Sequence, residues 1–250
     1  GDTLIVDMFP WELSSNVDLD ADSTHTYTIT AKVEIDLSEG SDGDNNYDEC
    51  SSNESNNPAE GEGLFNQSVL LDGFDMEIDR DTACADLPYI IHTKTLAGEP
   101  MDMGQNQFAV SYDIVVTNIG GETGTYGLED IPGFEDDIEI ISAAYVSDAP
   151  GFAGDTLIVD MFPWELSSDV DLDADSTHTY TITAKVEIDL SEGSSGDNTY
   201  DPCASSSESN SSKEGEGLFN QSVLLDGFDM EIYRDTACTD LPYIIHTKTL

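Results

Sequence analysis

Residues 177–190 read THTYTITAKVEIDL, and apolar and polar side chains alternate through this whole stretch. In an extended chain one face would carry the apolar and aromatic side chains, and the other would carry threonines, Lys185 and acids. Residues 108–117 alternate in the same way and are followed by Asn118 and a pair of glycines. Period-two alternation of this length predicts two long strands, each with one buried face.

Shorter strands are expected around these two. They are predicted at residues 89–96, 125–128, 138–146, 155–161, 218–225 and 228–233. The sequence has no helical periodicity of useful length. About seven or eight strands in a unit predict an all-β fold, built as an antiparallel β-sandwich.

The chain contains a long internal repeat. Residues 1–48 match residues 154–201, and residues 61–96 match residues 215–250. The matched segments differ only at Asn16/Asp169, Asp42/Ser195, Asn46/Thr199, Asp79/Tyr233 and Ala85/Thr239. Differences concentrate in the segment between the matches, which is rich in serine and is expected to be a variable loop.

The repeat also predicts domain boundaries, because residues 97–153 occur only once. Residues 1–86 would form a partial β-sandwich that lacks its first strands, residues 87–241 a complete one, and residues 242–250 the first strand of a further unit. A partial unit would expose unpaired strand edges and half a core. We therefore expect either a longer tandem array or neighbouring chains that complete each other's units.

The charge of the chain excludes some partners. It carries 53 Asp and Glu against 7 Lys and Arg, for a formal net charge of -46. Such a surface repels phosphate backbones and anionic lipids, so nucleic-acid binding is not expected. No apolar run approaches the roughly 20 residues that a spanning helix needs, so no membrane insertion is expected in this segment. The acidity suits high salt, where the screening length is about 3 Å at 1 M, or bound divalent cations.

Several segments of the unit resemble a known family. They are HTKTLAGEPMDMGQNQFAVSYDIVVTNIGGETGTYGLEDIPGF (92–134), SAAYVSDAPGF (142–152), STHTYTITAKVEIDL (176–190), GLFNQSVLL (217–225) and DTACTDLP (235–242). In this order they resemble the conserved-repeat β-sandwich modules called domain of unknown function 11. The resemblance covers the unit from 88 to 241 and most of the partial one. It implies Ig-like modules in large secreted, adhesin-like or filament-forming surface proteins of bacteria and archaea, and it implies no reaction.

Each copy carries one pair of cysteines. Cys50 would pair with Cys84, and Cys203 with Cys238. Two isolated thiols without a CxxC motif are a poor metal site, and catalysis by either thiol lacks a convincing base. A disulfide in an oxidising, extracellular compartment is the better interpretation. It would close a loop of about 35 residues and stabilise the fold by roughly 4 kcal/mol.

Acidic residues at alternate positions suggest a Ca²⁺ site. They are Asp169, Asp171, Asp173 and Asp175 in the second copy and Asp18, Asp20 and Asp22 in the first. In an extended segment these carboxylates would share one face, and Ca²⁺ prefers such oxygen ligands. The pattern lacks the glycine and the distal glutamate of an EF-hand loop. A solvated strand edge is the equally weighted alternative.

Lys94 and Asn220 suggest a covalent cross-link. Each shares a strand face with apolar residues, so both side chains are predicted to point inward. In a related class of surface sandwiches a buried lysine on the first strand bonds to an asparagine on a late strand, assisted by a buried acid. Here Asp130 or Asp113 would be that acid, although Asp113 is out of phase with the apolar face of its strand. The alternative is a lysine that extends to the sheet edge.

Two sequons, at Asn53 and Asn210, lie in the serine-rich variable segments and are candidate glycosylation sites. The sequons at Asn66 and Asn220 lie in predicted strands and would be poor acceptors.

No hydrolase, metalloprotease, P-loop or dinucleotide motif occurs, and His178 is predicted to pack beside Tyr180 rather than act as a base. We therefore expect a non-enzymatic extracellular protein of tandem acidic sandwiches, stabilised by cations, that forms a surface filament or stalk with other copies of itself. The alternative is a multivalent adhesin that binds glycans or cells through its variable loops.

Overall fold

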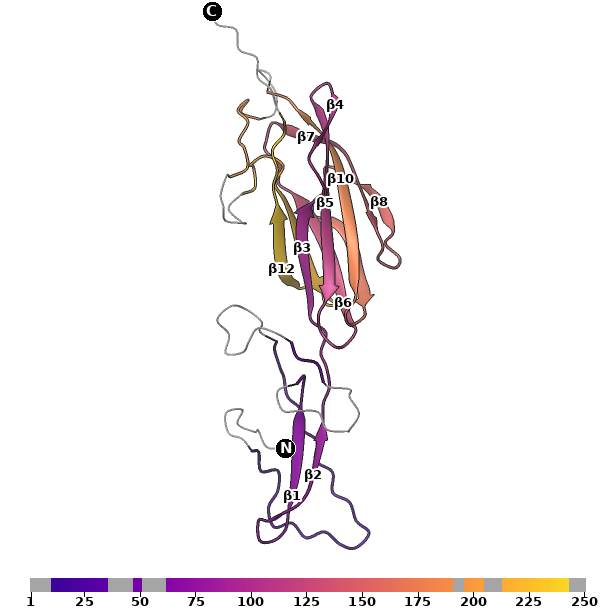
Figure 1. Cartoon of the computed structure of the whole chain (residues 1–250), viewed down its shortest axis with the longest axis vertical. Helices are drawn as coiled ribbons and strands as arrows, with labels where there is room; N and C mark the ends of the chain where they lie inside the picture. The colour runs from indigo at the N-terminus through magenta and orange to yellow at the C-terminus, as the bar shows by residue number, and fades with distance from the viewer. Residues whose placement is uncertain (1–9, 36–46, 51–61, 191–195, 205–212, 243–250) are drawn as a thin grey trace, which may run out of the picture.

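The computed structural model describes residues 10–35, 47–50, 62–190, 196–204 and 213–242. These residues form β-strands and loops, and they include no helix that could cross a membrane (Figure 1). The strands are β1 (Asn66–Leu71), β2 (Glu77–Ala83), β3 (Ile90–Leu96), β4 (Met101–Gly104), β5 (Gln107–Asn118), β6 (Gly124–Pro132), β7 (Ile138–Ser147), β8 (Gly154–Leu157), β9 (Trp164–Leu172), β10 (Thr177–Ile188), β11 (Asn220–Asp226) and β12 (Glu231–Ala237).

Strands β3 to β12 form an Ig-like antiparallel β-sandwich and lie within the unit expected at 87–241. One sheet has the order β3-β5-β10-β7-β8, with β4 paired to β5, and the other has the order β12-β11-β6-β9. Every pairing within them is antiparallel. The all-β sandwich predicted from the sequence is therefore confirmed.

The core lies between the two sheets. Every second side chain of β5 is buried along the whole strand, and β10 buries its own alternate side chains beside it. Tyr112, Ile114 and Ile182 face Leu128 and Leu166 of the second sheet, and all five are fully buried. The alternation of the two longest strands thus fills the core as expected.

Two strands were not predicted, and one is shorter than predicted. Strand β4 is a short hairpin partner of β5, and β8 covers only the beginning of the segment expected at 155–161. Strand β9 contains Asp169, whose φ of 51° interrupts its alternation, and its pairing with β6 has register shifts. A bulge of this kind hides the period-two pattern from the sequence.

The first copy shares only part of this structure. Its hairpin of β1 and β2 has the same register and the same irregularity as β11 and β12. Residues 10–35, which match the whole of β9 and β10, form no strand. Leu13 is 42% exposed, whereas its counterpart Leu166 is 0% exposed.

The physical reason is the lack of partner strands. In the sandwich β10 lies between β5 and β7, and β9 pairs with β6. These partners belong to residues 97–153, which the sequence contains once. The strand expected at 242–250 lies outside the described residues, apart from Pro242.

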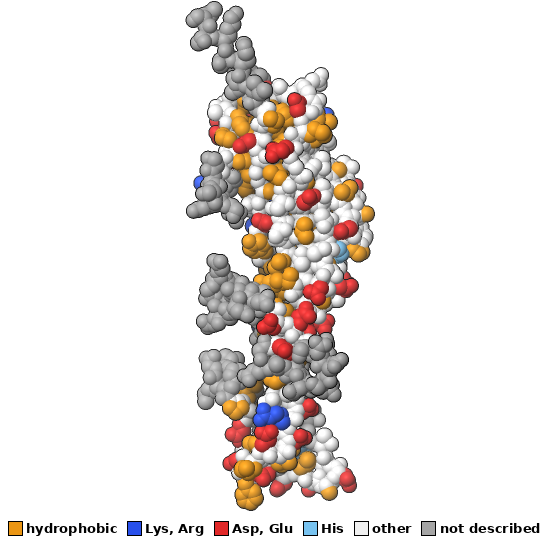
Figure 2. Space-filling view, viewed as in Figure 1, with side chains coloured by type: hydrophobic (Ala, Val, Ile, Leu, Met, Phe, Trp, Pro, Cys, Tyr) orange, Lys and Arg blue, Asp and Glu red, His pale blue; other side chains and the backbone are white. Residues whose placement is uncertain are grey.

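The surface carries the acidic charge. Figure 2 shows Asp and Glu side chains distributed along one face of the molecule, with few basic side chains among them. The alternating strands keep these acids on their outer faces, away from the core. A net charge of -46 is therefore compatible with a dry interior.

Candidate cross-linking site

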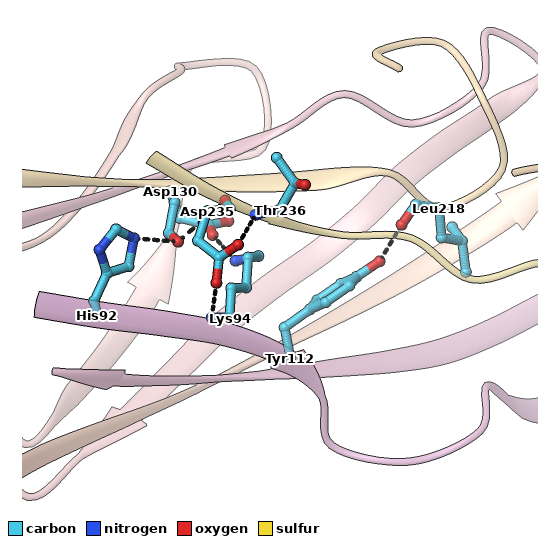
Figure 3. A network of polar contacts seen from close by, with 8 residues as sticks. His92, Lys94, Tyr112, Asp130, Leu218, Asp235 and Thr236 are labelled. Carbon is cyan, nitrogen blue, oxygen red and sulfur yellow. Dashed lines mark hydrogen bonds and ion pairs between the residues drawn. The ribbon is translucent and has the colours of Figure 1, made fainter. Parts of the chain in front are cut away.

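A buried ion pair joins the two sheets. Lys94 of β3 projects into the interior, and its Nζ contacts Oδ2 of Asp130 on β6 (Figure 3). Both side chains are fully buried. Because β3 and β6 belong to different sheets, this contact crosses the core of the sandwich.

The strand pattern of β3 explains the inward direction of Lys94. His92 and Lys94 are buried, and Ile91 and Thr93, on either side of His92, point outward. The backbone N–H of Lys94 donates to Oδ2 of Asp235, at 2.7 Å. The other oxygen of Asp235 accepts the backbone N–H of Thr236, at 2.8 Å. Asp235 therefore fastens β3 to β12 at the level of the lysine.

Tyr112 forms one wall of the lysine site. The Lys94 Nζ lies 5.2 Å from the centroid of the Tyr112 ring, within the range of a cation–π contact. The Tyr112 hydroxyl donates to the carbonyl oxygen of Leu218, at 2.5 Å. Leu218 lies two residues before Asn220, so Tyr112 also positions the start of β11.

Asn220 lies in this part of the core with its amide unsatisfied. Its side chain is 1% exposed, and within the described part of the chain neither its Oδ1 nor its Nδ2 makes a hydrogen bond of normal geometry, although the amide is close enough to Asp130 to act against the rise in the pKa of that carboxyl group. Ser222 of β11 lies directly opposite Asp130, and Asn220 is two residues along the same strand. A buried amide without partners costs about 1–3 kcal/mol, so its retention calls for an explanation.

Burial opposes both charges of the ion pair. Burial lowers the pKa of Lys94, and the charge of Asp130 opposes that change. Burial raises the pKa of Asp130, and the charge of Lys94 and the amide of Asn220 act in the opposite direction. Loss of solvation thus favours the neutral amine and the neutral acid over the charged pair.

This arrangement can carry out an amide exchange. A neutral lysine amine is a nucleophile, and a protonated carboxyl group can polarise an amide carbonyl. Oδ1 of Asp130 has no hydrogen-bond partner among the described residues, so it is free to contact a reacting group. The amine, the acid and the amide that such a reaction requires are buried in one part of the core.

The structure places the sequence-predicted acids differently. Asp130 is the acid beside Lys94, whereas Asp113 lies on the other face of β5 and accepts a hydrogen bond from Thr181 Oγ1, at 2.6 Å. The sequence did not predict that Tyr112 and Asp235 would lie beside Lys94. Tyr112 could have been found from the alternation of residues 108–117, but no local pattern reveals Asp235.

Both predicted disulfides are present. Cys50 is bonded to Cys84 and Cys203 to Cys238, with Cα–Cα distances of 5.9 and 6.0 Å. In the second copy the bond joins the segment after β10 to the residue that follows β12.

Hydrogen bonds next to each disulfide also fix the segment through which the chain leaves each copy. The Tyr200 hydroxyl accepts the backbone N–H of Leu241, at 3.0 Å, as Tyr47 does for Leu87, at 2.7 Å. Asp240 accepts the backbone N–H of Cys203, at 2.8 Å. The two copies therefore end in the same hydrogen-bonded arrangement.

The alternating acids do not form a cluster. Asp169 and Asp175 have positive φ, so the segment is not extended throughout, and Asp171 and Asp173 accept hydrogen bonds from Thr125 and Thr123. The matching residues of the first copy, Asp18, Asp20 and Asp22, are exposed as well. None of these acids belongs to a group of three or more described carboxylates whose oxygens lie within 4.8 Å of one another. A Ca²⁺ site at these positions remains a prediction.

Other predicted residues are placed as follows. The candidate glycosylation sites Asn53 and Asn210 lie outside the described residues. His178 is half-buried beside Tyr180, and its Nδ1 lies 2.8 Å from the Tyr126 hydroxyl. His178 thus packs beside the core, as expected.

An open groove of about 540 Å³ lies beside the start of β7. Phe134, Ile138, Val159 and Phe162 contribute to its lining. It is lined by strand and turn residues and not by the variable loops, so it differs from the loop-lined cleft expected of a multivalent binder. Glycan binding remains a prediction.

The chain matches no protein-family model and no curated protein sequence. Among solved structures it is similar to the collagen adhesin from S. aureus, with 8% identity over 64% of this chain and 53% of the adhesin, and a TM-score of 0.29. It is also similar to the major pilin subunit of Bacillus cereus, with 11% identity over 70% of this chain and 48% of the pilin, and a TM-score of 0.26. The chain thus spans about half the length of each, and scores this low assign it no role.

Proposed function

We propose that this chain is a structural, non-enzymatic part of an extracellular protein and that an amide bond between Lys94 and Asn220 locks its sandwich. The observation that carries this proposal is the buried Lys94–Asp130 pair with the unsatisfied amide of Asn220 in the same part of the core. Such a group of residues is costly to bury, and the cross-link explains why each member is there.

The reaction is balanced without a co-reactant. Lys94 Nζ, as the neutral amine, attacks Cγ of Asn220, whose carbonyl is polarised by the protonated carboxyl of Asp130. The new bond is Nζ–Cγ, and the bond that breaks is Cγ–Nδ2. Asp130 transfers the proton that leaves Nζ to Nδ2, so ammonia is released and Asp130 ends as it began. No oxidation or reduction takes place.

The position of the bond suits a mechanical role. The chain enters the unit through β3 in one sheet and leaves it through β11 and β12 in the other sheet. A bond from β3 to the first residue of β11 would carry tension directly from one strand to the other. Residues 95–219 would then be shielded from a pulling force.

The repeat and the disulfides support the rest of the proposal. Disulfides persist in oxidising compartments, and near-identical units in series are typical of structural arrays. The resemblance to the domain of unknown function 11 modules points the same way. The partners would be further units of the same kind, arranged head to tail as a filament or stalk.

The direct test is the intact mass of the reduced 250-residue chain, produced without glycosylation. The cross-link predicts a mass about 17 Da below that of the sequence, because ammonia is lost. Proteolysis should also yield one branched peptide that joins the segments around Lys94 and Asn220. The full sequence mass in folded protein would contradict the proposal.

Three variants sharpen this test. Asn220→Ala and Asp130→Ala should restore the full mass, the first by removing the acceptor and the second by removing the proton carrier. Asn66→Ala is the matched control, because Asn66 occupies the same sequence in the first copy, where it is exposed on β1. It should retain the loss of 17 Da, and a full mass for this variant would refute the assignment to Asn220.

A further inference from the structure

Four carboxyl groups meet at one end of the sandwich, away from the Lys94 site. Glu135, Asp136 and Asp137 lie in the connection from β6 to β7, and Asp197 lies in the segment that follows β10. One oxygen from each of the four lies within 4.8 Å of those of the others. Four carboxylates at this spacing repel one another when all are ionised, unless something between them compensates.

Backbone hydrogen bonds fix the connection that carries three of these acids. The N–H of Glu135 donates to the carbonyl of Gly217, at 2.9 Å, and the N–H of Asp189 donates to the carbonyl of Asp137, at 3.0 Å. The N–H of Asp137 donates to Oε2 of Glu135, also at 3.0 Å. The acids therefore sit on a backbone held by the strands around them.

Glu135 provides a second and independent observation. Its side chain is 2% exposed, and its Oε1 has no hydrogen-bond partner among the described residues. A buried carboxylate oxygen is costly without a partner, and the closest groups in the cluster are further carboxylates. A positively charged ligand would satisfy this oxygen.

Gly196 lets the fourth acid approach. A Cβ at this position would lie 2.2 Å from Oδ1 of Asp137 and 2.8 Å from Oδ1 of Asp136. Any side chain at 196 would collide with the acids of the β6–β7 connection. The glycine therefore allows Asp197, the next residue, to complete the cluster.

We propose that Glu135, Asp136, Asp137 and Asp197 bind one Ca²⁺ ion. Ca²⁺ takes oxygen ligands at about 2.3–2.6 Å, so ligand oxygens on its opposite sides are up to about 5 Å apart. Oxygens within 4.8 Å of one another can thus all contact one ion. Mg²⁺ fits less well, because it demands a regular octahedron at about 2.0–2.1 Å and dehydrates reluctantly.

The ion would connect the core to the exit of the unit. Asp197 precedes Tyr200, whose hydroxyl accepts the N–H of Leu241, and Cys203, which is bonded to Cys238. A bound ion would attach this segment to the start of β7. The site differs from the alternating acids of β9, and it depends neither on the Lys94–Asn220 bond nor on the mechanical role.

Calorimetric titration of the chelator-treated 250-residue chain with CaCl₂ tests the proposal. Titration in 1 M NaCl removes diffuse binding to the acidic surface, because the screening length there is about 3 Å. We expect one saturable Ca²⁺ site and a higher melting temperature in its presence. Mg²⁺ should bind at least about tenfold more weakly. No saturable site, or equal affinity for Mg²⁺, would overturn the assignment.

Two exposed residues supply matched variants. Asp197→Asn should weaken Ca²⁺ binding at least about tenfold and remove the shift in melting temperature, because it removes a charged ligand. Asp171→Asn removes an exposed acid of β9 and should bind Ca²⁺ like the unsubstituted chain. If Asp171→Asn lost the site and Asp197→Asn kept it, the ion would belong to β9 and this inference would be wrong.

Discussion

At the scale of single residues, the sandwich buries ionisable groups whose burial would be costly without a nearby partner. His92 is buried on β3, with its Nε2 2.9 Å from Ser222 Oγ and its ring edge-on to Tyr233. Burial lowers the pKa of His92 to about 4, although the charge of Asp235 opposes this. The folded protein therefore keeps His92 neutral where an unfolded chain would protonate it.

This shift predicts acid sensitivity between pH 6.5 and pH 4. In that window the unfolded chain takes up a proton that the folded chain refuses, so the free energy of unfolding falls as the pH falls. The total effect is about 3 kcal/mol, and it is complete below pH 4. His92→Gln should remove this part of the pH dependence, as measured by urea unfolding at a series of pH values.

His25→Gln is the control, because His25 is exposed in the first copy. It should leave the pH profile unchanged. A profile that is the same for His92→Gln and the unsubstituted chain would show that His92 is not the group responsible.

Sequence alternation predicted the inward direction of Lys94 and Asn220 and favoured Asp130 over Asp113. It did not predict Asp235 or the group around Glu135. Those residues meet through contacts between segments that are distant in the chain, and a local pattern carries no information about such contacts. The alternating acids of β9 were visible in the sequence, but they lie apart in the structure.

At the scale of elements, the disulfide of the second copy fastens the end of β12. It joins residues separated by 35 positions. Removing both cysteines, as Cys203→Ser with Cys238→Ser, should lower the stability of the sandwich by about 4 kcal/mol in the chain-entropy model. Denaturant unfolding with and without the substitutions measures this change.

The first copy supplies the matched control. Cys50 and Cys84 close a loop of nearly the same length, with a separation of 34. This disulfide is not part of the sandwich of β3 to β12, so Cys50→Ser with Cys84→Ser should leave sandwich unfolding unchanged. Equal destabilisation by both pairs would mean that the two copies unfold as one unit.

The strands themselves were partly predictable. Strands β5 and β10 follow from their uninterrupted alternation, because one side chain in two meets the opposite sheet. Strand β9 was missed because the bulge at Asp169 changes which residues point inward. Here the pairing with β6 determines the strand, and the local pattern does not.

At the scale of the whole molecule, the two copies of the repeated sequence adopt partly different structures. Val170 and Leu172 of β9 are buried, whereas their counterparts Val17 and Leu19 are 51% and 57% exposed. The hairpins and disulfides of the two copies are nonetheless alike. The difference follows the presence of partner strands, since β9 and β10 pair with strands from the segment that occurs once.

The sequence predicted this repeat and its period directly. It also led to the expectation that residues 1–86 form a partial unit, which stays a prediction. The extent to which the remaining segments would lose their strands was not predictable, because a strand's stability depends on its partners as much as on its own residues.

The most direct test of a repeated, self-locking unit is the mass of a longer chain. A second copy of residues 88–153 placed directly before Gly1 would give Asn66 a lysine and an acid equivalent to Lys94 and Asp130. We expect the reduced chain to lose about 17 Da twice, once for each bond, as each new amide releases ammonia. A single loss would show that the first copy cannot form the same sandwich, and it would contradict the central claim.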